Sequence, residues 1–402
     1  MGLRSIKEIF VIGHGPSSSH TMGPYFACQY ILNKYKDEKI KEIEVILYGS
    51  LALTGKGHLT DAIIELALKD INHKITFNTK TVKGHPNTMT FKIKTAKKTI
   101  SENVVSIGGG SIVTVDNIET INEGETYPHQ HMSEVQKYCE DNDMSFYDYV
   151  MKFEKEDLTP YFEKVLKTMD EAVERGLLTE GYLPGKLKVK RKAKSMYEAM
   201  EETSLGVNDV AMNVAIHSFA VAEENAAGGI IVTAPTCGSA GVIPGCVKYL
   251  RMKGVSDKNI VRGLMVAGLF GIICKMNASV SGAEAGCQAE IGVACSMAAA
   301  MIAFCFGKNI VDIIQSAEIA LEHSLGLTCD PVDGYVQIPC IERCAIYAIK
   351  AINAVKLAII IPNDNIHVSY DDSIRTMYLT GLDMNKKYKE TSLGGLAEII
   401  KS

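Results

Sequence analysis

The pattern of hydrophobic residues changes near residue 130, and this change limits the folds that the chain can adopt. Before it, apolar and polar residues alternate in four segments, which predicts β-strands, and residues 58–69 have helical spacing. The four predicted strands are residues 42–48, 74–80, 88–94 and 103–107. After it, segments rich in Ala, Met and Leu follow one another at helical length. We therefore expect an α+β fold, with an α/β domain at residues 1–130 and a mostly all-α domain at residues 131–402.

The composition excludes several classes of protein. A net charge of −5 argues against a nucleic-acid-binding surface, and the basic run at residues 186–192 is expected to be a solvated segment. Arg4 and Lys7 interrupt the amino terminus before the apolar core of a secretory signal can form. The apolar stretch at residues 291–306 is too short for a membrane span and is expected to be a buried helix. We expect a cytoplasmic protein with no nucleic-acid or membrane partner.

Cysteine is unusually concentrated in the second half of the chain. Nine of the eleven cysteines lie between Cys237 and Cys344. Structural disulfides are not expected in a reducing compartment, so these residues are either small buried hydrophobes or ligands of a metal or cluster. Packing alone is a sufficient explanation for four of the eleven cysteines, namely Cys28, Cys246, Cys274 and Cys305.

Two segments rich in small polar residues stand at the start of predicted helices. The sequence GHGPSSSHTMGP, residues 13–24, places hydroxyls and two histidines between an apolar run and a helix. The sequence TAPTCGSAGVIPG, residues 233–245, enters a helix near Gly241. Free N–H groups and short hydroxyls at such a helix start suit a carboxylate or phosphate, although an ordinary capped turn has the same composition.

Three cysteines occupy positions where a side chain can be directed rather than packed. Cys329 and Cys340 each lie close to a proline, and Cys287 follows a glycine-rich bend. Cys340 and Cys344 would share one helix face. The spacing matches neither a zinc site nor a ferredoxin motif, so it leaves metal ligation and packing both open.

Taken together, these motifs carry a resemblance to a known family. GHGPSSSHTMGP, the segment SLALTGKGH at residues 50–58, TAPTCGSAGVIPG, GAEAGCQAEIGVACSMAAA at 282–300 and GLTCDPVDGYVQIPCIERC at 326–344 resemble the iron–sulfur-dependent L-serine dehydratases. The tail YKETSLGGLA, residues 388–397, is also similar. The resemblance implies that the β and α domains of that family are fused here, and that the chain is an L-serine ammonia-lyase.

The resemblance also implies a cofactor and a set of roles. Members convert L-serine to pyruvate and ammonia with a [4Fe–4S] cluster, whose open iron acts as a Lewis acid on the hydroxyl while a histidine removes the α-proton. By motif match, the cluster ligands would be Cys287, Cys329 and Cys340. The base would be His58, with His20 nearby. The substrate-binding residues would be Ser17, Ser18, Ser19, Thr21, Thr236, Gly238 and Ser239. Cys295 and Cys344 would then be packing residues.

Two alternatives remain at this stage. A pyridoxal-phosphate dehydratase catalyses the same reaction through a Schiff-base lysine, for which Lys56 or Lys275 could be proposed. A non-catalytic iron–sulfur protein that senses serine is the second alternative, although no helix-turn-helix or basic face supports an output to DNA. We expect a homodimer that acts on a small-molecule substrate.

Overall fold

The computed structural model describes residues 3–80, 85, 87–114, 125–202, 209–362 and 366–400. The chain forms two compact units. One, here called the α/β unit, comprises residues 13–123 and 227–229. The other, here called the helical unit, comprises residues 1–12, 124–226 and 230–402. The α+β class predicted from the sequence is confirmed, since an amino-terminal α/β region precedes a largely helical one.

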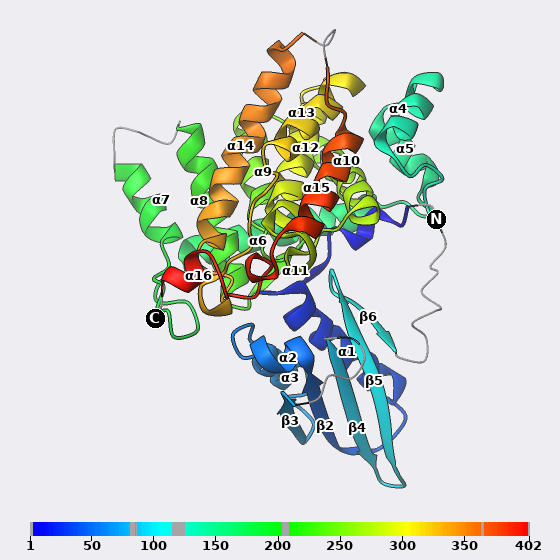
Figure 1. The fold of residues 1–402 in the computed structure, drawn as a ribbon, viewed down its shortest axis with the longest axis vertical. Coiled ribbons are helices and arrows are strands. Elements are labelled where there is room, and N and C mark those ends of the chain that lie inside the picture. The colour runs from blue at the N-terminus through cyan, green and yellow to red at the C-terminus, as the bar shows by residue number, and fades with distance from the viewer. Residues whose placement is uncertain are drawn as a thin grey trace. The chain divides into compact units, whose positions relative to one another are not determined.

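The α/β unit is built on a five-stranded mixed sheet of order β3-β2-β4-β5-β6 (Figure 1). The strands are β2 (Ile40–Tyr48), β3 (His73–Asn78), β4 (Thr88–Thr95), β5 (Thr99–Gly108) and β6 (Ser111–Thr114). Only β2 and β3 are parallel, with Val45 opposite Ile75, and the other neighbours are antiparallel. The four predicted strands are thus confirmed, with bounds shifted by a few residues. Alternation along much of β2 and β4 gives the sheet one apolar face.

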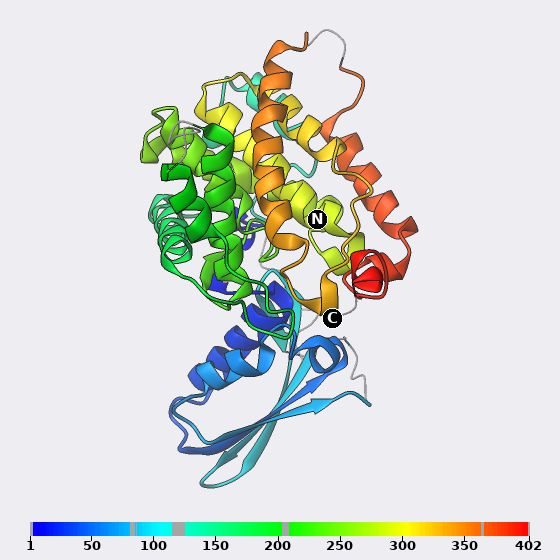
Figure 2. The ribbon, with the colours of Figure 1, turned by 90° about the vertical axis from the view of Figure 1, so that its left-hand side faces the viewer.

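Helices cover that apolar face. They are α1 (Gly23–Lys34), α2 (Gly49–Thr54) and α3 (Thr60–Ala67), the last within the predicted helix at residues 58–69 (Figure 2). Val45, Phe91 and Ile93 are fully buried against them. The opposite face carries charges, and Glu44 lies 3.1 Å from Lys92 across β2 and β4. Because exposed ion pairs of this kind contribute little, burial of the apolar face is what holds the unit together.

The helical unit contains the remaining helices. Its long helices are α4 (Met132–Asp141), α5 (Phe146–Phe153), α6 (Thr159–Leu178), α7 (Ala193–Glu202), α8 (Val210–Ala226), α9 (Val242–Met252), α10 (Asp257–Asn277), α12 (Val293–Cys305), α13 (Ile310–Glu322), α14 (Cys340–Ile360) and α15 (Tyr370–Asp383). The short elements used below are α11 (Gly282–Ala285), η4 (Gln288–Gly292), η5 (Val332–Gly334) and α16 (Leu396–Ile399). In Figure 1, α14 runs beside α8, α12 and α13, against which it packs.

The core of this unit is formed by α10 and α12. Both are apolar on nearly all sides, which is typical of a helix surrounded by other helices. The segments Asp257–Asn277 and Gln288–Cys305 are long and apolar enough to cross a membrane, yet 78% and 83% of their apolar windows are buried inside the protein. The prediction of a buried helix at residues 291–306 is therefore confirmed, but the expectation that it is too short to span a membrane is wrong, because the helical run that contains nearly all of it extends over Gln288–Cys305.

Candidate functional site

The three predicted ligand cysteines lie in the helical unit, on three separate segments. Cys287 stands between α11 and the π-helical turn η4, Cys329 follows α13, and Cys340 is the first residue of α14. Cys287 and Cys329 are buried, and Cys340 is partly buried. The Cys329 thiol is hydrogen-bonded to Cys287, and the charge of Cys287 also acts on Cys340. The fold thus brings together residues that are 53 positions apart in the chain, 287 to 340.

The electrostatics of the three thiols differ. The hydrogen bond from Cys329, assisted by the Arg343 guanidinium, lowers the pKa of Cys287 in spite of its burial. The same hydrogen bond and burial raise the pKa of Cys329, and burial raises the pKa of Cys340. Cys287 is therefore the thiol that ionises first, and a thiolate is the form that binds metals.

Arg343 connects all three cysteine segments. It lies one turn after Cys340 on α14, and its Nη1 donates to the carbonyl of Thr328 at 2.9 Å. Its Nη2 donates to the Asp330 carboxylate at 3.1 Å, so that the guanidinium holds the backbone on both sides of Cys329. It also hydrogen-bonds Cys287. The planar fork of arginine suits this role because it offers several donors in fixed directions.

Two partly buried carboxyl groups, those of Glu290 and Glu390, lie close to these thiols. The Cys329 thiol is 3.8 Å from Glu290 Oε2. Burial raises the pKa of Glu290, and burial followed by the charges of Glu290 and Cys287 raises that of Glu390 to about 8. Neither carboxyl was singled out from the sequence.

The turn before α9 contacts the same carboxylate. Thr236 Oγ1 donates to Glu290 Oε1 at 2.9 Å and lies 3.2 Å from Ser239 Oγ. The Gly238 carbonyl accepts a hydrogen bond from the Cys344 thiol at 3.3 Å. The structure therefore places three of the predicted substrate-binding residues, Thr236, Gly238 and Ser239, in the turn that contacts Glu290, the carboxylate next to the Cys329 thiol.

The predicted histidines form a second group, in the α/β unit. The rings of His20 and His58 have centroids 4.6 Å apart, and both side chains are buried. His20 Nδ1 is 2.8 Å from Ser19 Oγ, and its Nε2 is 3.0 Å from Ser50 Oγ. Burial lowers the pKa of both histidines, and the neighbouring His58 lowers that of His20 further. Both rings are therefore neutral near pH 7.

The tautomer of His58 is fixed by its surroundings. Its Nδ1 lies 3.1 Å from the carbonyl of Thr54, which can only accept a hydrogen bond. Nδ1 must then carry the proton, so the basic lone pair is on Nε2. His20 has hydroxyls at both nitrogens, and these can donate or accept. Of the two rings, His58 is the one with a defined proton-accepting nitrogen.

The serine-rich loop shapes this second group. Ser17 precedes the π-helical turn η2 (Ser18–Met22), and its hydroxyl accepts from the backbone N–H of His20 at 3.2 Å. Thr21 Oγ1 accepts from the Ser17 N–H at 2.7 Å and donates to the Ser17 carbonyl at 2.7 Å. Ser18 is buried, and Ser19 contacts His20. The four predicted hydroxyl residues are thus together, with Thr21 already bonded within the loop.

The chemistry of the donors in the helical unit fits an iron–sulfur cluster. Cys287, Cys340 and Asp330 act on one guanidinium, and Glu290 and Glu390 lie beside Cys329, so acidic groups outnumber the one cation and a positively charged metal centre would offset them. In the part of the chain that the structure describes, no three His, Cys, Asp or Glu side chains are arranged to hold a single metal ion. A single ion requires all ligands at one centre, whereas a cluster distributes its thiolates over several irons.

Sequence reasoning missed Arg343, Glu290 and Glu390. Glu290 is the one carboxylate in the apolar stretch GCQAEIGVACSMAAA, residues 286–300, and a charge in such a stretch is a usable signal because buried charges are rare unless paired. Arg343 lies between two cysteines one helical turn apart, which is a similar signal. Glu390 offers no local signal, since the tail around it is polar.

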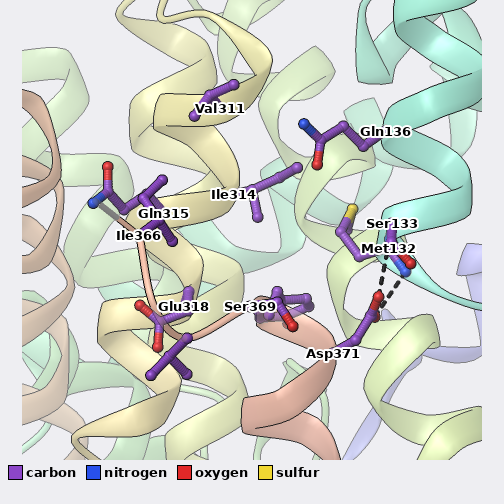
Figure 3. Close-up of a pocket in the computed structure, with 12 residues that line it drawn as sticks. Met132, Ser133, Gln136, Val311, Ile314, Gln315, Glu318, Ile366, Ser369 and Asp371 are labelled. Atoms are coloured by element: carbon purple, nitrogen blue, oxygen red, sulfur yellow. Dashed lines mark hydrogen bonds between the residues drawn. The ribbon is translucent and has the colours of Figure 1, made fainter. Parts of the chain in front are cut away.

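A separate cavity of about 140 Å³ lies elsewhere in the helical unit. Figure 3 shows it between α4, α13 and the segment entering α15, with Asp371 accepting from the backbone N–H groups of Met132 and Ser133 at 2.9 and 3.0 Å. Apolar residues such as Ile314 line much of it. None of the residues predicted as functional lines this cavity, so it is distinct from both groups described above.

Fold and site together define a protein with three neighbouring cysteine thiols in a helical unit and a pair of neutral histidines in an α/β unit. The family described as serine dehydratase alpha chain matches residues 56–397, and the one described as serine dehydratase beta chain matches residues 5–72. The chain belongs to the serine dehydratase family.

Similar proteins extend over nearly the whole chain. The L-serine dehydratase of Haemophilus influenzae and L-serine dehydratase 2 of Escherichia coli K12 are each 40% identical, over 98% of this chain and 98% of their own. The L-serine dehydratase of Helicobacter pylori J99 is 39% identical over 99% of both chains. The family resemblance inferred from the motifs is confirmed.

Proposed function

We propose that this protein is an L-serine dehydratase, an ammonia-lyase that converts L-serine to pyruvate and ammonia. The observation that carries the proposal is the similarity over 98% of the chain to proteins named L-serine dehydratase. The buried thiols of the helical unit support it, because they offer the donor set that the reaction's proposed cofactor needs.

The proposed cofactor is a [4Fe–4S] cluster held by Cys287, Cys329 and Cys340. When bound, a cluster with three thiolate ligands supplies one open iron as a Lewis acid for the β-hydroxyl of serine, which is otherwise a poor leaving group. Arg343 prepares the ligands, since it stabilises the Cys287 thiolate and holds the backbone around Cys329.

His58 is the proposed base. A base must be unprotonated at the working pH, and burial keeps His58 neutral. The carbonyl of Thr54 directs the lone pair to Nε2, the nitrogen that would take the α-proton of serine. His20 is proposed to support it, through its ring contact with His58 and its hydrogen bonds to Ser19 and Ser50.

The atoms of the reaction balance with these groups. His58 takes the α-proton, the electron pair of that C–H bond forms the C=C bond, and the β-hydroxyl leaves as hydroxide, so that the proton and the hydroxide together amount to one lost water molecule. The enamine that remains tautomerises to an imine, and one water molecule hydrolyses it to pyruvate and ammonium. We propose that the substrate carboxylate and amine are held by the hydroxyls and amides of the predicted binding residues. These are Ser17, Ser18, Ser19, Thr21, Thr236, Gly238 and Ser239.

The pyridoxal-phosphate alternative finds less support from the lysines. Lys275 Nζ lies 2.7 Å from Glu8 Oε2, and an ammonium held in an ion pair is not available as the free amine that a Schiff base requires. The Lys56 ammonium lies over the ring of Phe77, 5.6 Å from its centroid. Both contacts are ordinary structural uses of lysine.

One anaerobic experiment tests the proposal. The purified protein is assayed for pyruvate release from L-serine, for bound iron and sulfide, and for visible absorbance. Turnover with broad absorbance and about four irons per chain supports it. Turnover with pyridoxal-type absorbance would contradict the cluster, and iron without turnover would favour the serine-sensing alternative.

We further propose that the enzyme acts in the cytoplasm as a homodimer. All eleven cysteines are free thiols, which suits a reducing compartment. Size-exclusion chromatography with light scattering measures the assembly, and a monomeric mass would contradict the dimer.

A further inference from the structure

The basic run at residues 186–192 belongs to a small hairpin, residues 181–192. The Leu183 N–H donates to the Val189 carbonyl at 2.8 Å, and the Arg191 N–H donates to the Gly181 carbonyl at 2.9 Å. The lysines of the run are exposed, as a solvated segment requires, but that prediction is wrong for Arg191, whose exposed fraction is 8%. A buried arginine at the base of a surface hairpin needs a partner.

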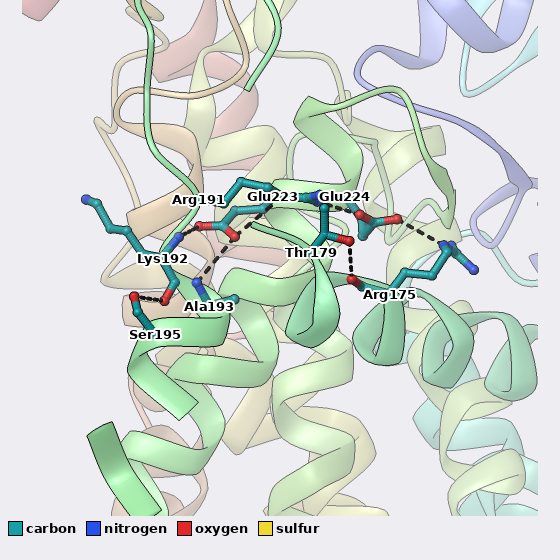
Figure 4. A network of polar contacts seen from close by, with 8 residues as sticks. All are labelled: Arg175, Thr179, Arg191, Lys192, Ala193, Ser195, Glu223 and Glu224. Carbon is teal, nitrogen blue, oxygen red and sulfur yellow. Dashed lines mark hydrogen bonds and ion pairs between the residues drawn. The ribbon is translucent and has the colours of Figure 1, made fainter. Parts of the chain in front are cut away.

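Two glutamates of α8 fix the base of the hairpin, as Figure 4 shows. Arg191 Nη2 donates to Glu224, which also accepts from Arg175 Nε at 2.9 Å. Glu223 accepts from the backbone N–H groups of Lys192 and Ala193 at 2.7 and 3.3 Å, which caps the start of α7. The hairpin therefore starts and ends on the rigid core of the helical unit.

The tip of the hairpin docks onto the segment between two of the proposed ligands. Gln337 Nε2 donates to the Pro184 carbonyl at 2.7 Å. Gly185 has a φ of +99°, and a Cβ on it would lie 2.4 Å from Cε1 of Tyr335. A side chain at position 185 is thus excluded by both the backbone conformation and the tyrosine ring.

Two ion pairs extend the contact, one to this segment and one to the first turn of α14 beyond it. Lys186 Nζ lies 3.3 Å from Asp333 Oδ2, and Lys192 Nζ lies 3.1 Å from Glu342 Oε1. Each ion pair is partly exposed and contributes little stability alone. Because the two pairs lie at the two ends of the contact, they fix how the hairpin is aligned with the residues that it faces. Two of the alternating lysines, Lys186 and Lys192, therefore form specific ion pairs.

We propose that this hairpin is a positioning element for the thiols of Cys329 and Cys340, with Gln337 and Arg191 as positioning residues. The inference rests on the proposed function only for the identity of the group that the thiols hold. The segment 330–339 contains the short turn η5 but no strand or longer helix, and its own backbone hydrogen bonds close only local turns, such as the bond from the Val332 N–H to the Ile338 carbonyl at 3.0 Å. Contacts from outside the segment must then supply the order that a ligand site needs.

Two glycine substitutions separate docking from backbone strain. Gly185→Ala introduces a side chain where the tip meets Tyr335. Gly181→Ala is the matched control, because Gly181 has a similar φ of +105° and a Cβ there would meet nothing within 4 Å. Both variants carry the same conformational cost, and only the first disturbs the docked tip. Gln337→Met removes the bond to Pro184 at nearly constant volume and serves as a second test variant.

The first readout is iron release to a chelator, followed anaerobically through the visible absorbance. Gly185→Ala and Gln337→Met should release iron about 10–100-fold faster, the usual range when the support of a metal ligand is lost, while Gly181→Ala should match the wild type. The second readout is the alkylation rate of Cys329 and Cys340 in iron-free protein, read by mass spectrometry. It should rise in the same two variants, with that of the remote core thiol Cys246 unchanged.

The two readouts keep the inference separate from the proposed function. If the wild type binds no iron, the proposed cofactor fails, but selective alkylation still supports the hairpin as a positioning element for the two thiols. Equal alkylation in Gly185→Ala and Gly181→Ala, or no increase in either, overturns the inference whether or not iron is bound.

Discussion

Arg343→Gln is the substitution whose effect on the free energy of unfolding the structure defines most closely. It removes the donor to the Thr328 carbonyl and leaves the Asp330 carboxylate without its cation. The Asp330 side chain is 5% exposed and would keep mainly the Leu396 N–H at 2.8 Å. Removing one partner of a buried ion pair costs about 3–5 kcal/mol, because the other charge stays buried. At about 2–4 °C per kcal/mol for a domain of roughly this size, we expect the melting temperature to fall by roughly 6–20 °C.

A double-mutant cycle with Asp330→Asn tests the reasoning by calorimetry under anaerobic, reducing conditions. The double variant should recover part of the loss, because the uncompensated charge is gone. Arg251→Gln is the control. Arg251 forms a bidentate pair with Asp170 at 2.7 and 2.8 Å and a second pair with Asp257 at 2.9 Å, but the Arg251 and Asp170 side chains are 34% and 37% exposed, so each pair is worth about 1 kcal/mol or less. If Arg343→Gln costs no more than Arg251→Gln, or if the two losses in the cycle simply add, Arg343 is not the organising residue described here.

Three further outcomes are expected. Replacing Cys287, Cys329 or Cys340 by Ala should each abolish bound iron and activity, whereas Cys295→Ala should retain iron by metal analysis; a full cluster in any of the first three would remove that residue from the ligand set. His58→Gln should keep the iron while turnover falls by about 10²–10⁴-fold, and near-normal turnover in this variant would exclude His58 as the base. Because burial lowers the pKa of His58, the acidic limb of the wild-type pH profile should lie below the ordinary histidine value of about 6.5. Aeration should inactivate the enzyme, with L-serine prolonging its half-life by occupying the open iron; activity that survives both air and iron chelators would contradict a three-cysteine cluster.

The sequence predicted those features that have a local signal. Alternating residues in β2 and β4 identified the sheet, because one side chain in two faces the core. Cys287, Cys329 and Cys340 could be singled out because the residues around them repeat a family pattern. Arg343 could not be assigned a role in this way, since its partners Thr328 and Asp330 are contacts made by folding rather than by spacing.

The hairpin at residues 181–192 also has a feature that depends on tertiary contacts and could not be predicted from the sequence. The four lysines of the run KLKVKRK are exposed, as composition predicts for a solvated segment, whereas Arg191 is buried. Its burial depends on Glu223 and Glu224, which are more than 30 positions away on α8. A charge run indicates a solvated face on average, and one residue in it can still be held by a tertiary ion pair.

Both candidate groups lie at a π-helical turn that leads into an α-helix, and close packing accounts for it. His20 lies in η2 before α1, and Glu290 lies in η4 before α12. Each turn adjoins a glycine pressed against a neighbouring serine. A Cβ on Gly23 would lie 2.1 Å from Ser106 Oγ, and one on Gly292 would lie 2.7 Å from the Ser324 Cβ. A widened turn shifts the following residues around the helix axis, so it can direct a polar side chain away from the helix while the glycine maintains the packing. Neither feature is visible in a residue pattern read at a period of 3.6, which explains why the sequence predicted only the start of a helix at residues 13–24.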